Sequence, residues 1–503
     1  MAEEGTAEAY RDPLSAAAAP RLWPTMNNDS HARVVAELLA RQPEHQIGPS
    51  LERIQLLVEL LGDPHRSAPV VHITGTNGKG STAIMVDALL RAQGLRTGRY
   101  ASPHLFDVTE RICVDGRPVT AETFDAAWEQ IKPFVEMVDE RRIDGIAMTF
   151  FEVLTGLAFA VFADAPVDVA ILEVGMGGSW DATNVADATV AVVTPIAVDH
   201  TEYLGSTPAE IAVEKSGIIK PGSVAVLAGQ EPDVARILVE RAASVGARVV
   251  AEGIDFSLLD RAPGVGGQVL RLDYAGGTVE DVLLPLYGVH MAHNAALALA
   301  AVSALHGDRP IEAEVVTAGF GDVIAPARLE RVRTSPPVVL DTAHNAAAVE
   351  ATVKAAVEAF AFAPLVVVLG IMRDKDVAGV LGALVDEVDH LVVTQPPGAR
   401  ALPAADLAEL AQGVVGEDRV VVRADLADAI EAAVAIADES GPSAGVLLLG
   451  SVALAGQARA LLVTESADVP AAAPTVSVTD DDWDVPDSLD VTRFGGRDWG
   501  SDA

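Results

Sequence analysis

The chain has 503 residues, a formal net charge of -37 and an apolar content of 50%, so it is long enough for roughly two to four domains with sizeable cores. The negative charge argues against nucleic acid as a partner. The chain holds no run of about 18 uncharged apolar residues, which argues against a membrane span. The single cysteine, Cys113, excludes an intramolecular disulfide and favours the reducing cytoplasm. We expect no secretory signal, because Glu3 and Glu4 stand where a basic region would precede an apolar stretch.

The first two thirds of the chain alternate between two kinds of pattern. Residues 1–28 are rich in Ala and Pro, which predicts a flexible lead-in, and residues 31–61 have helical periodicity. Strands are then predicted at 70–74, 167–174, 189–194 and 224–227, with helices near 81–93, 149–162 and 208–218. Glycine pairs at 264–267 and 276–277 predict hairpin turns. The alternation predicts a mostly parallel sheet with helices on both faces, in a domain of residues 29–325.

A second alternating unit follows, and it predicts a smaller domain at 326–463. Its expected strands are 338–341, 365–370, 391–394, 420–422 and 446–450, with helices between them. Residues 464–503 are rich in Pro, Ala and Asp, which predicts a disordered acidic tail. The fold class is therefore α/β, with two doubly wound domains.

The most informative segment is 70–82, which reads V-V-H-I-T-G-T-N-G-K-G-S-T. A buried strand, a glycine loop, a lysine and a hydroxyl before a helix is the arrangement that cradles phosphates, so we expect ATP as a ligand. The usual phosphate loop has the hydroxyl directly after the lysine, whereas Gly80 separates Lys79 from Ser81. The alternative is a plain glycine-rich turn between a strand and a helix.

Two further strand ends carry polar residues. Glu173 ends a buried strand before a glycine loop, where open α/β sheets bind ligands and where a carboxylate suits magnesium. The next strand ends at Asp199 and His200. Lys215 follows within one helix, and by spacing alone it is a solvated lysine. Three residues of the loop after Glu173 are candidates for holding that loop or a metal shell, namely Asp181, Thr183 and Asn184.

Seven segments now appear in a fixed order: T-G-T-N-G-K-G-S, S-P-H-L with E-R-I, E-V-G-M-G-G-S-W-D-A-T-N, D-H with L-G, E-K-S-G-I-I-K-P-G, P-A-R-L-E and D-T-A-H-N. Over residues 45–460 the chain resembles the folylpolyglutamate synthase/dihydrofolate synthase family of the Mur ligase superfamily. The resemblance implies a phosphate-loop ATP-binding domain of the Mur ligase type and a Rossmann-like C-terminal domain. It implies an ATP-dependent ligase that adds L-glutamate to dihydropteroate, to a reduced folate, or to both, through an acyl phosphate.

The resemblance also implies roles for individual residues. Two magnesium ions are implied, one held by Ser81 and Glu173 and one by Glu173 and His200, with Lys215 carbamylated beside the second. Catalysis is implied for Lys79, His200, Lys215, Asp341 and His344. Nucleotide binding is implied for Gly75, Thr76, Asn77, Gly78, Lys79, Gly80, Ser81, Thr82, Asn294, Arg328 and Asp341. Substrate binding is implied for Ser102, His104, Arg111, Phe151, Glu152, Asp181, His344 and Asn345.

Three positions depart from the family pattern. Met291 stands where the family has glutamine, and a thioether cannot make the hydrogen bonds of an amide. Thr342 and Ala346 replace glycine and proline, and Thr342 is hard to place if the backbone there needs positive φ. These departures leave open a binding protein with impaired catalysis, beside the second alternative of a cell-wall Mur ligase. The family implies a monomer.

Overall fold

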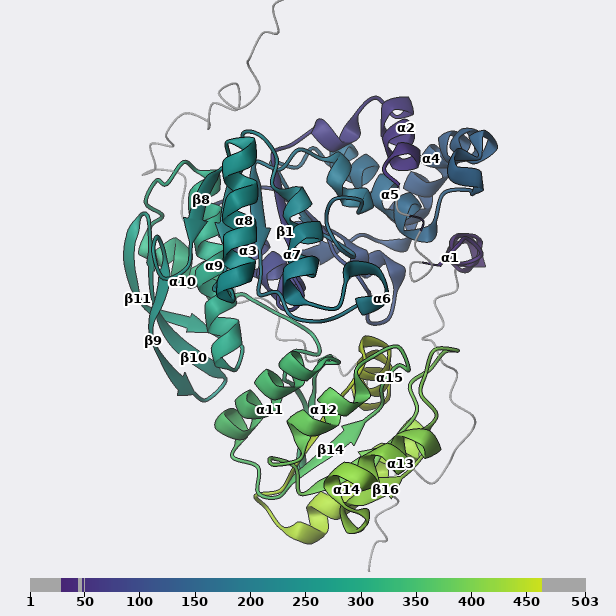
Figure 1. Cartoon of the computed structure of the whole chain (residues 1–503), viewed down its shortest axis with the longest axis vertical. Helices are drawn as coiled ribbons and strands as arrows, with labels where there is room; N and C mark the ends of the chain where they lie inside the picture. Colours follow the sequence, from purple (N-terminus) through teal and green to yellow (C-terminus); the bar gives the residue numbers. More distant parts are fainter. Residues whose placement is uncertain (1–28, 44–47, 49, 464–503) are drawn as a thin grey trace, which may run out of the picture.

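The computed structural model describes residues 29–43, 48 and 50–463, so the predicted lead-in and acidic tail lie outside the described residues. Figure 1 shows two α/β units, one above the other, joined where teal turns to green. The first unit carries an eight-stranded sheet and a three-stranded sheet, and the second carries a six-stranded sheet. The predicted fold class of two doubly wound α/β units is confirmed.

The first sheet has the strand order β4-β3-β2-β5-β1-β6-β7-β8. From β2 to β8 all neighbours pair in parallel, while β3 and β4 form an antiparallel edge. Parallel pairing buries both faces, which is why β1, β5 and β6 consist almost entirely of buried residues. The strands are β1 (Val70–Thr74), β2 (Thr97–Tyr100), β3 (Ile112–Val114), β4 (Arg117–Pro118), β5 (Val169–Glu173), β6 (Val190–Val193), β7 (Val224–Leu227) and β8 (Arg248–Ala251).

Helices cover both faces of this sheet. One face packs on α3, α9 and α10 through Val71 and Ile73 of β1, and the other packs on α1, α2, α4 and α5. The helical periodicity of residues 31–61 corresponds to two helices, and Pro43 and Gly48 fall between them, where both disfavour a helix. The helices are α1 (Asp29–Leu39), α2 (Glu52–Leu60), α3 (Lys79–Ala92), α4 (Ala121–Arg141), α5 (Phe150–Asp164), α6 (Thr201–Leu204), α7 (Pro208–Lys215), α8 (Pro232–Val245), α9 (Val289–Leu305) and α10 (Ala313–Gly321).

The predicted hairpin turns join three antiparallel strands on the outer side of the first unit (Figure 1). These strands are β9 (Ser257–Gly264), β10 (Gly267–Tyr274) and β11 (Gly277–Leu284), so both glycine pairs lie at the turns. Their inner side chains, such as Leu270 and Leu272, pack into the same core as α9. Within the described ranges, no helix combines the length and apolarity that a membrane crossing requires.

The second unit has the strand order β12-β13-β17-β14-β15-β16, parallel except for β12. All five strands predicted for this unit are present. The strands are β12 (Glu330–Thr334), β13 (Pro337–Leu340), β14 (Leu365–Leu369), β15 (His390–Val393), β16 (Val420–Val422) and β17 (Gly445–Leu449). The helices are α11 (Ala346–Phe360), α12 (Val377–Leu384), α13 (Ala404–Val415), α14 (Leu426–Ser440) and α15 (Val452–Leu462). The division at 325/326 falls between α10 and β12 and stays a prediction.

Candidate active site

The carboxyl ends of both parallel sheets open onto one cavity of about 3260 Å³. Its walls come from the loops that follow β1, β2, β5, β6 and β7 in the first unit and β13, β14, β15 and β17 in the second. Ligands of open α/β sheets bind at these strand ends. A cavity shared by two units is therefore suited to hold two substrates, each presented by a different set of loops.

The phosphate loop runs from β1 into α3 and is fixed by its own unit. Gly78 caps α3 with φ of 89°, and a Cβ there would lie 2.7 Å from Asn294 Oδ1, so only glycine fits. The amides of Thr76 and Asn77 donate to the Pro195 carbonyl at 3.0 and 3.4 Å. These two amides are therefore bonded to the backbone of the protein itself. The backbone N–H groups at the N-terminus of α3 are therefore the groups that can bind a phosphate.

Gly80, the departure from the usual phosphate loop, lies against Glu173 at the end of β5. A Cβ at position 80 would lie 3.4 Å from Glu173 Oε2, an ordinary van der Waals contact, so the loop and this carboxylate lie close together. Burial raises the pKa of Glu173, while the charges of Lys79 and Arg328 oppose the rise. Ser81 is buried beside it in the first turn of α3. A further cation near Glu173 would stabilise its ionised form.

Lys215 is a buried residue of α7 and not the solvated lysine that its spacing indicated. Its Nζ donates to the Gly75 carbonyl of the phosphate loop at 2.7 Å. Burial, with the charge of Lys79, lowers the pKa of Lys215 to about 7. About half of these amines are consequently neutral near pH 7, and a neutral amine is a nucleophile.

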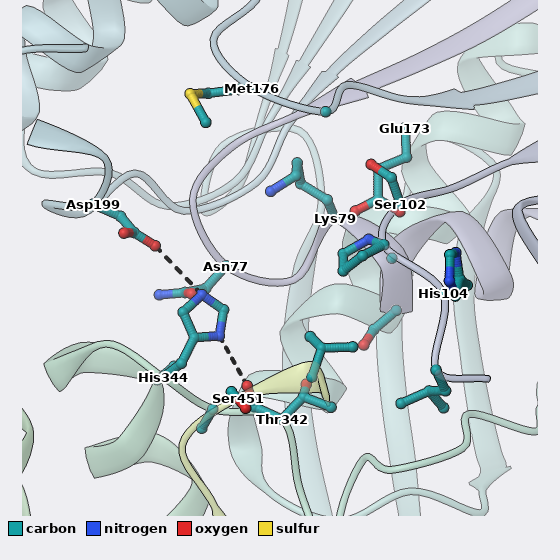
Figure 2. A pocket seen from close by; sticks show the side chains of 18 of the residues that line it. Asn77, Lys79, Ser102, His104, Glu173, Met176, Asp199, Thr342, His344 and Ser451 are labelled. Atoms are coloured by element: carbon teal, nitrogen blue, oxygen red, sulfur yellow. Dashed lines mark hydrogen bonds and ion pairs between the residues drawn. The ribbon is translucent and has the colours of Figure 1, made fainter. Parts of the chain in front are cut away.

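Asp199 connects the two units. Its Oδ1 accepts from Lys375 Nζ at 2.7 Å, and its Oδ2 lies 3.5 Å from His344 Nε2 and 3.3 Å from Asn345 Nδ2. Burial opposes ionisation, but the hydrogen bond from His344 and the charges of His200 and Lys375 hold the pKa of Asp199 well below its usual range. Figure 2 shows His344 between Asp199 and the Thr342 carbonyl, to which His344 Nδ1 donates at 2.9 Å.

His200, the neighbour of Asp199, faces the same cavity. Burial lowers the pKa of His200 to about 4 against the pull of Asp199, although 36% of its side chain stays exposed. The imidazole is therefore neutral at pH 7, which is the form that binds metal ions.

Arg328 is displayed on a strained turn between the units. The residues on either side, Ala327 and Leu329, both have positive φ, at 52° and 48°. Two carboxylates hold this turn: the Leu329 amide donates to Asp341 Oδ2 at 3.0 Å, and the Ala327 amide donates to Glu330 Oε2 at 2.8 Å. Strain held by such bonds is typical of functional sites. Asp341 thus positions Arg328 in the cavity.

The loop after β2 forms the opposite wall. His104 Nδ1 accepts from Arg111 Nε at 2.9 Å, and the Arg111 guanidinium lies 5.3 Å from the centre of the Phe150 ring. The carboxylate of Glu110 accepts from three backbone amides of the loop, at 2.9 to 3.0 Å. Ser102 lies two residues after the end of β2 and close to Lys79 and Glu173 in Figure 2. This wall presents aromatic and cationic groups to an acceptor.

Two residues predicted to bind substrate are occupied by structural contacts. The Glu152 carboxylate accepts from the Thr149 amide in a capping box of α5 and from Arg53 Nε at 3.0 Å. The Asp181 carboxylate accepts from the amides of Met176 and Thr183, each at 3.0 Å. Burial raises the pKa of Asp181, and these hydrogen bonds oppose the rise. Both side chains line the cavity, but their hydrogen bonds hold its walls.

Most predicted site residues line the cavity, and two do not. Thr82 is buried in α3, and Asn345 caps α11 while it exchanges amide hydrogen bonds with Asn77 at 3.0 and 3.2 Å. The cavity-lining members are Gly75, Thr76, Asn77, Gly78, Lys79, Gly80, Ser81, Ser102, His104, Arg111, Phe151, Glu152, Glu173, Asp181, His200, Lys215, Asn294, Arg328, Asp341 and His344.

Sequence reasoning missed Asp199 and Lys375 as site residues. Asp199 follows β6 and Lys375 follows β14, so each lies at the carboxyl edge of its sheet. A charged residue at that edge is a signal for a ligand-binding site, and this signal was present for both. The three unusual residues cause no strain. Thr342 is absent from the residues with positive φ, Ala346 begins α11, and Met291 is buried with its sulfur 3.9 Å from Asn294 Nδ2.

The donor set near the phosphate loop fits a hard divalent cation. Glu173 supplies a buried carboxylate, Ser81 a hydroxyl and His200 a neutral imidazole. Among the described residues, no group of three or more His, Cys, Asp or Glu side chains is arranged to hold a metal ion by itself. Phosphate oxygens and water are therefore needed to complete the coordination, as is usual for magnesium beside a nucleotide.

Comparison with known proteins identifies both units. Residues 73–302 match the Mur ligase middle domain and residues 327–452 match the Mur ligase glutamate ligase domain. With the phosphate loop and the shared cavity, these domains define an ATP-dependent ligase.

The relatives specify the family. The dihydrofolate synthase/folylpolyglutamate synthase of Mycobacterium tuberculosis is 45% identical over 89% of this chain and 97% of its own length. A structure of the folylpolyglutamate synthase from that organism, complexed with ADP and AMPPCP, has a TM-score of 0.83 at 46% identity and covers 87% of this chain and 99% of its own. Escherichia coli FolC in complex with DHPP and ADP has a TM-score of 0.75 at 31% identity, over 86% and 97%. The chain belongs to the dihydrofolate synthase/folylpolyglutamate synthase family.

Proposed function

We propose that this ligase joins L-glutamate to the carboxylate of dihydropteroate and of reduced folates, with ATP converted to ADP and phosphate. One observation carries the proposal. A single cavity contains the phosphate loop of the first unit, the strained Arg328 turn with Asp341 and His344, and the acceptor wall with His104 and Arg111. Relatives with this architecture are complexed with ADP, and one with DHPP as well.

The chemistry has two steps. An oxygen of the acceptor carboxylate attacks the γ-phosphorus of ATP, and the bond to the ADP oxygen breaks, which leaves an acyl phosphate. The amine of L-glutamate then attacks the acyl carbon, a proton leaves the amine, and phosphate departs with the former carboxylate oxygen. Lys79 and Arg328 bring positive charge to the transferred group, and the N-terminus of α3 donates amides to it.

Magnesium is proposed in two sites, one held by Ser81 and Glu173 and the other by Glu173 and His200. The bound ions would screen the repulsion between the phosphates and the acceptor carboxylate. The protein keeps this set in place by burying Glu173 at the end of β5, against Gly80.

Carbamylation is proposed for Lys215. The neutral amine attacks carbon dioxide, a C–N bond forms and one proton is released, which turns the neutral amine into an anion. Its lowered pKa and its burial beside the Gly75 carbonyl support this step. Asp199, Asp181 and Glu214 already attract positive charge in this region, so a carbamate there would need a cation close by. The second magnesium would supply that charge.

Dihydropteroate and tetrahydrofolate differ in whether a first glutamate is already present, and we propose that the enzyme accepts both. The test is phosphate release with magnesium, ATP and L-glutamate, with each acceptor supplied separately. Turnover of both supports a bifunctional enzyme. Turnover of one alone restricts the function to that step, and turnover of neither favours the impaired homologue. A UDP-sugar peptide precursor serves as the acceptor for the cell-wall alternative, and we expect it to give no phosphate.

A monomer in the cytoplasm is also proposed. Both walls of the cavity come from one chain, so a second copy is not needed to complete it. The thiol of Cys113 is buried, and burial raises its pKa, which keeps it unreactive in a reducing compartment. Light scattering of the purified protein measures the oligomeric state directly.

A further inference from the structure

The central strand β1 carries two polar side chains on one face. All five residues of β1 are buried, and Val71 and Ile73 pack into the core with α3. Successive side chains of a strand point to opposite faces, so His72 and Thr74 share the other face. Both are 0% exposed. A buried polar side chain is costly unless it is hydrogen-bonded, so their partners show what the two residues do.

Both partners belong to one segment, residues 175–184, which follows β5. His72 Nε2 lies 2.8 Å from Thr183 Oγ1, and Thr74 Oγ1 donates to the Gly177 carbonyl at 2.8 Å. Gly175 of this segment lies against the ring of Phe151, which is predicted to bind substrate, and Met176 and Trp180 line the cavity. This cavity-lining segment is therefore bonded at two points to the strand that ends in the phosphate loop.

The direction of the hydrogen bonds follows from the donors available. The Thr183 hydroxyl has one proton and lies against Asp181 Oδ1, which also accepts the Thr183 amide. When that proton goes to the carboxylate, Thr183 Oγ1 accepts from His72, and His72 carries its proton on Nε2. His72 Nδ1 has no hydrogen-bond partner among the described residues, which fits an unprotonated nitrogen. The result is a directed chain from His72 through Thr183 to Asp181.

The far end of the segment is fixed as well. Lys220 Nζ donates to the carbonyls of Asn184 and Ala186 at 2.6 and 2.9 Å, which holds the turn that follows Asp181. Burial, with the charge of Lys220, lowers the pKa of His72 to about 3, so His72 is neutral at pH 7 and donates a single hydrogen bond from its ring.

We propose that His72 and Thr74 are positioning residues of the ligase, which hold the acceptor-side segment 175–184 at a fixed distance from the phosphate loop. The chemistry gives a reason for such a device. The acceptor carboxylate and the γ-phosphate must meet within about 3–3.5 Å, and a misplacement of about 1 Å can lower the rate about a hundredfold. Strand β1 carries the phosphate loop at its end and binds segment 175–184 on its face, so this one strand sets that distance. The inference rests on the proposed function.

The test uses Thr183→Val, which removes the hydroxyl at nearly constant shape, with Thr183→Ser as the matched control. We expect Thr183→Val to raise KM for dihydropteroate about tenfold and to leave KM for ATP within about twofold. Thr183→Ser should stay within about twofold of the wild type for both. Misplacement would also lower kcat, so turnover is divided by the concentration of folded protein; a merely structural role would change neither this corrected kcat nor either KM.

A second pair of variants, at Thr74, tests the other hydrogen bond between β1 and the segment. Thr74→Val removes the hydrogen bond to Gly177 and should raise the acceptor KM in the same way, while Thr74→Ser retains it. This pair decides the question if Thr183→Val does not fold. Unchanged acceptor KM in the folded valine variants, with an active wild type, overturns the inference alone. A wild type that ligates neither acceptor overturns the proposed function, and the inference falls with it.

Nitrogen NMR of histidine-labelled protein adds a readout that does not depend on turnover. At pH 7 we expect His72 as the neutral tautomer with its proton on Nε2, and we expect its proton to be less protected in Thr183→Val. The other tautomer in the wild type contradicts the directed chain.

Discussion

The phosphate loop and the contacts around Asp199 lie in the same cavity but are built in opposite ways. The backbone of the loop is held within the first unit, by groups such as the Pro195 carbonyl and by glycines that admit close neighbours, while the side chain of Asn77 also bonds to Asn345 of the second unit. Asp199 is held across two units by charged side chains, with Lys375 and His344 supplied by the second unit. Local chain geometry fixes the first site, whereas the second exists only while the two units are together.

Because of this difference, the two sites should respond differently when the placement of the second unit changes. The loop backbone tolerates changes in the placement of the second unit, because the bonds from the Thr76 and Asn77 amides to Pro195 lie within the first unit. The Asp199 contacts and the side-chain bonds between Asn77 and Asn345 cross between the units and depend on that placement. Closure of the units over the acyl phosphate, which excludes water, would therefore be linked to these contacts and not to the loop backbone.

The largest effect is expected where the loop itself loses its charge. Lys79→Ala should lower kcat about 10²–10³-fold, since one preformed donor to developing charge contributes that much. Phosphate release measures the loss. Lys354→Ala is the matched control, because Lys354 is an exposed residue of α11 and pairs only with Glu350 among the contacts described. Comparable loss in both variants would remove Lys79 from the site.

Lys215→Ala should lower kcat by about the same factor as Lys79→Ala. The activity of the wild type should depend on pH through Lys215. Only the neutral amine reacts with carbon dioxide, and the pKa of Lys215 is about 7, so carbamylation and activity should fall as the pH drops below about 7. Depletion of carbon dioxide should lower the wild-type rate, and added bicarbonate should restore it. Lys215→Ala should not respond to bicarbonate. An active, bicarbonate-independent alanine variant would show that no carbamate is needed.

Asp199→Asn tests the contacts between the units. The change leaves Lys375 without its counter-charge, and such truncations cost about 2 kcal/mol or more, so kcat/KM should fall at least about 30-fold. Asp308→Asn breaks an exposed pair with Arg248 and serves as the control. Adding Lys375→Met to Asp199→Asn should cause little further loss, because the pair acts as a unit. Additive losses would mean that the two side chains act separately.

The smallest effect is expected at Met291. Met291→Gln restores an amide beside Asn294, and one added neutral hydrogen bond should lower KM for ATP about two- to threefold. Met137→Gln on exposed α4 is the control and should leave KM unchanged. A large loss in Met291→Gln would show instead that packing around the thioether supports the nucleotide site.

The sequence predicted what depends on local pattern. The strand, glycine loop and helix of residues 70–93 were predicted almost residue by residue, because a buried β-branched run and a helical period lie on either side of the glycines. Glu173 and His200 were found as polar residues at strand ends. Lys215 was misjudged from spacing, because its burial depends on how α7 packs over the loop.

Contacts between distant segments were not predictable from the same patterns. Nothing in the segment around Lys375 indicates that it reaches Asp199, since the pairing depends on how the two sheets face each other. The same holds for Glu152, whose carboxylate is occupied by Arg53 and by the cap of α5 and not by a ligand. His72 gave no functional signal either, because its partner Thr183 lies 111 residues along the chain.

The central claim is that the acceptor carboxylate is activated as an acyl phosphate, and isotope transfer tests it directly. Dihydropteroate with ¹⁸O in its carboxylate is turned over with ATP and L-glutamate, and the phosphate released is analysed by mass spectrometry. The account predicts one ¹⁸O atom in each phosphate, because a carboxylate oxygen bridges to the γ-phosphorus and leaves with it. Ligation that yields unlabelled phosphate would contradict the account.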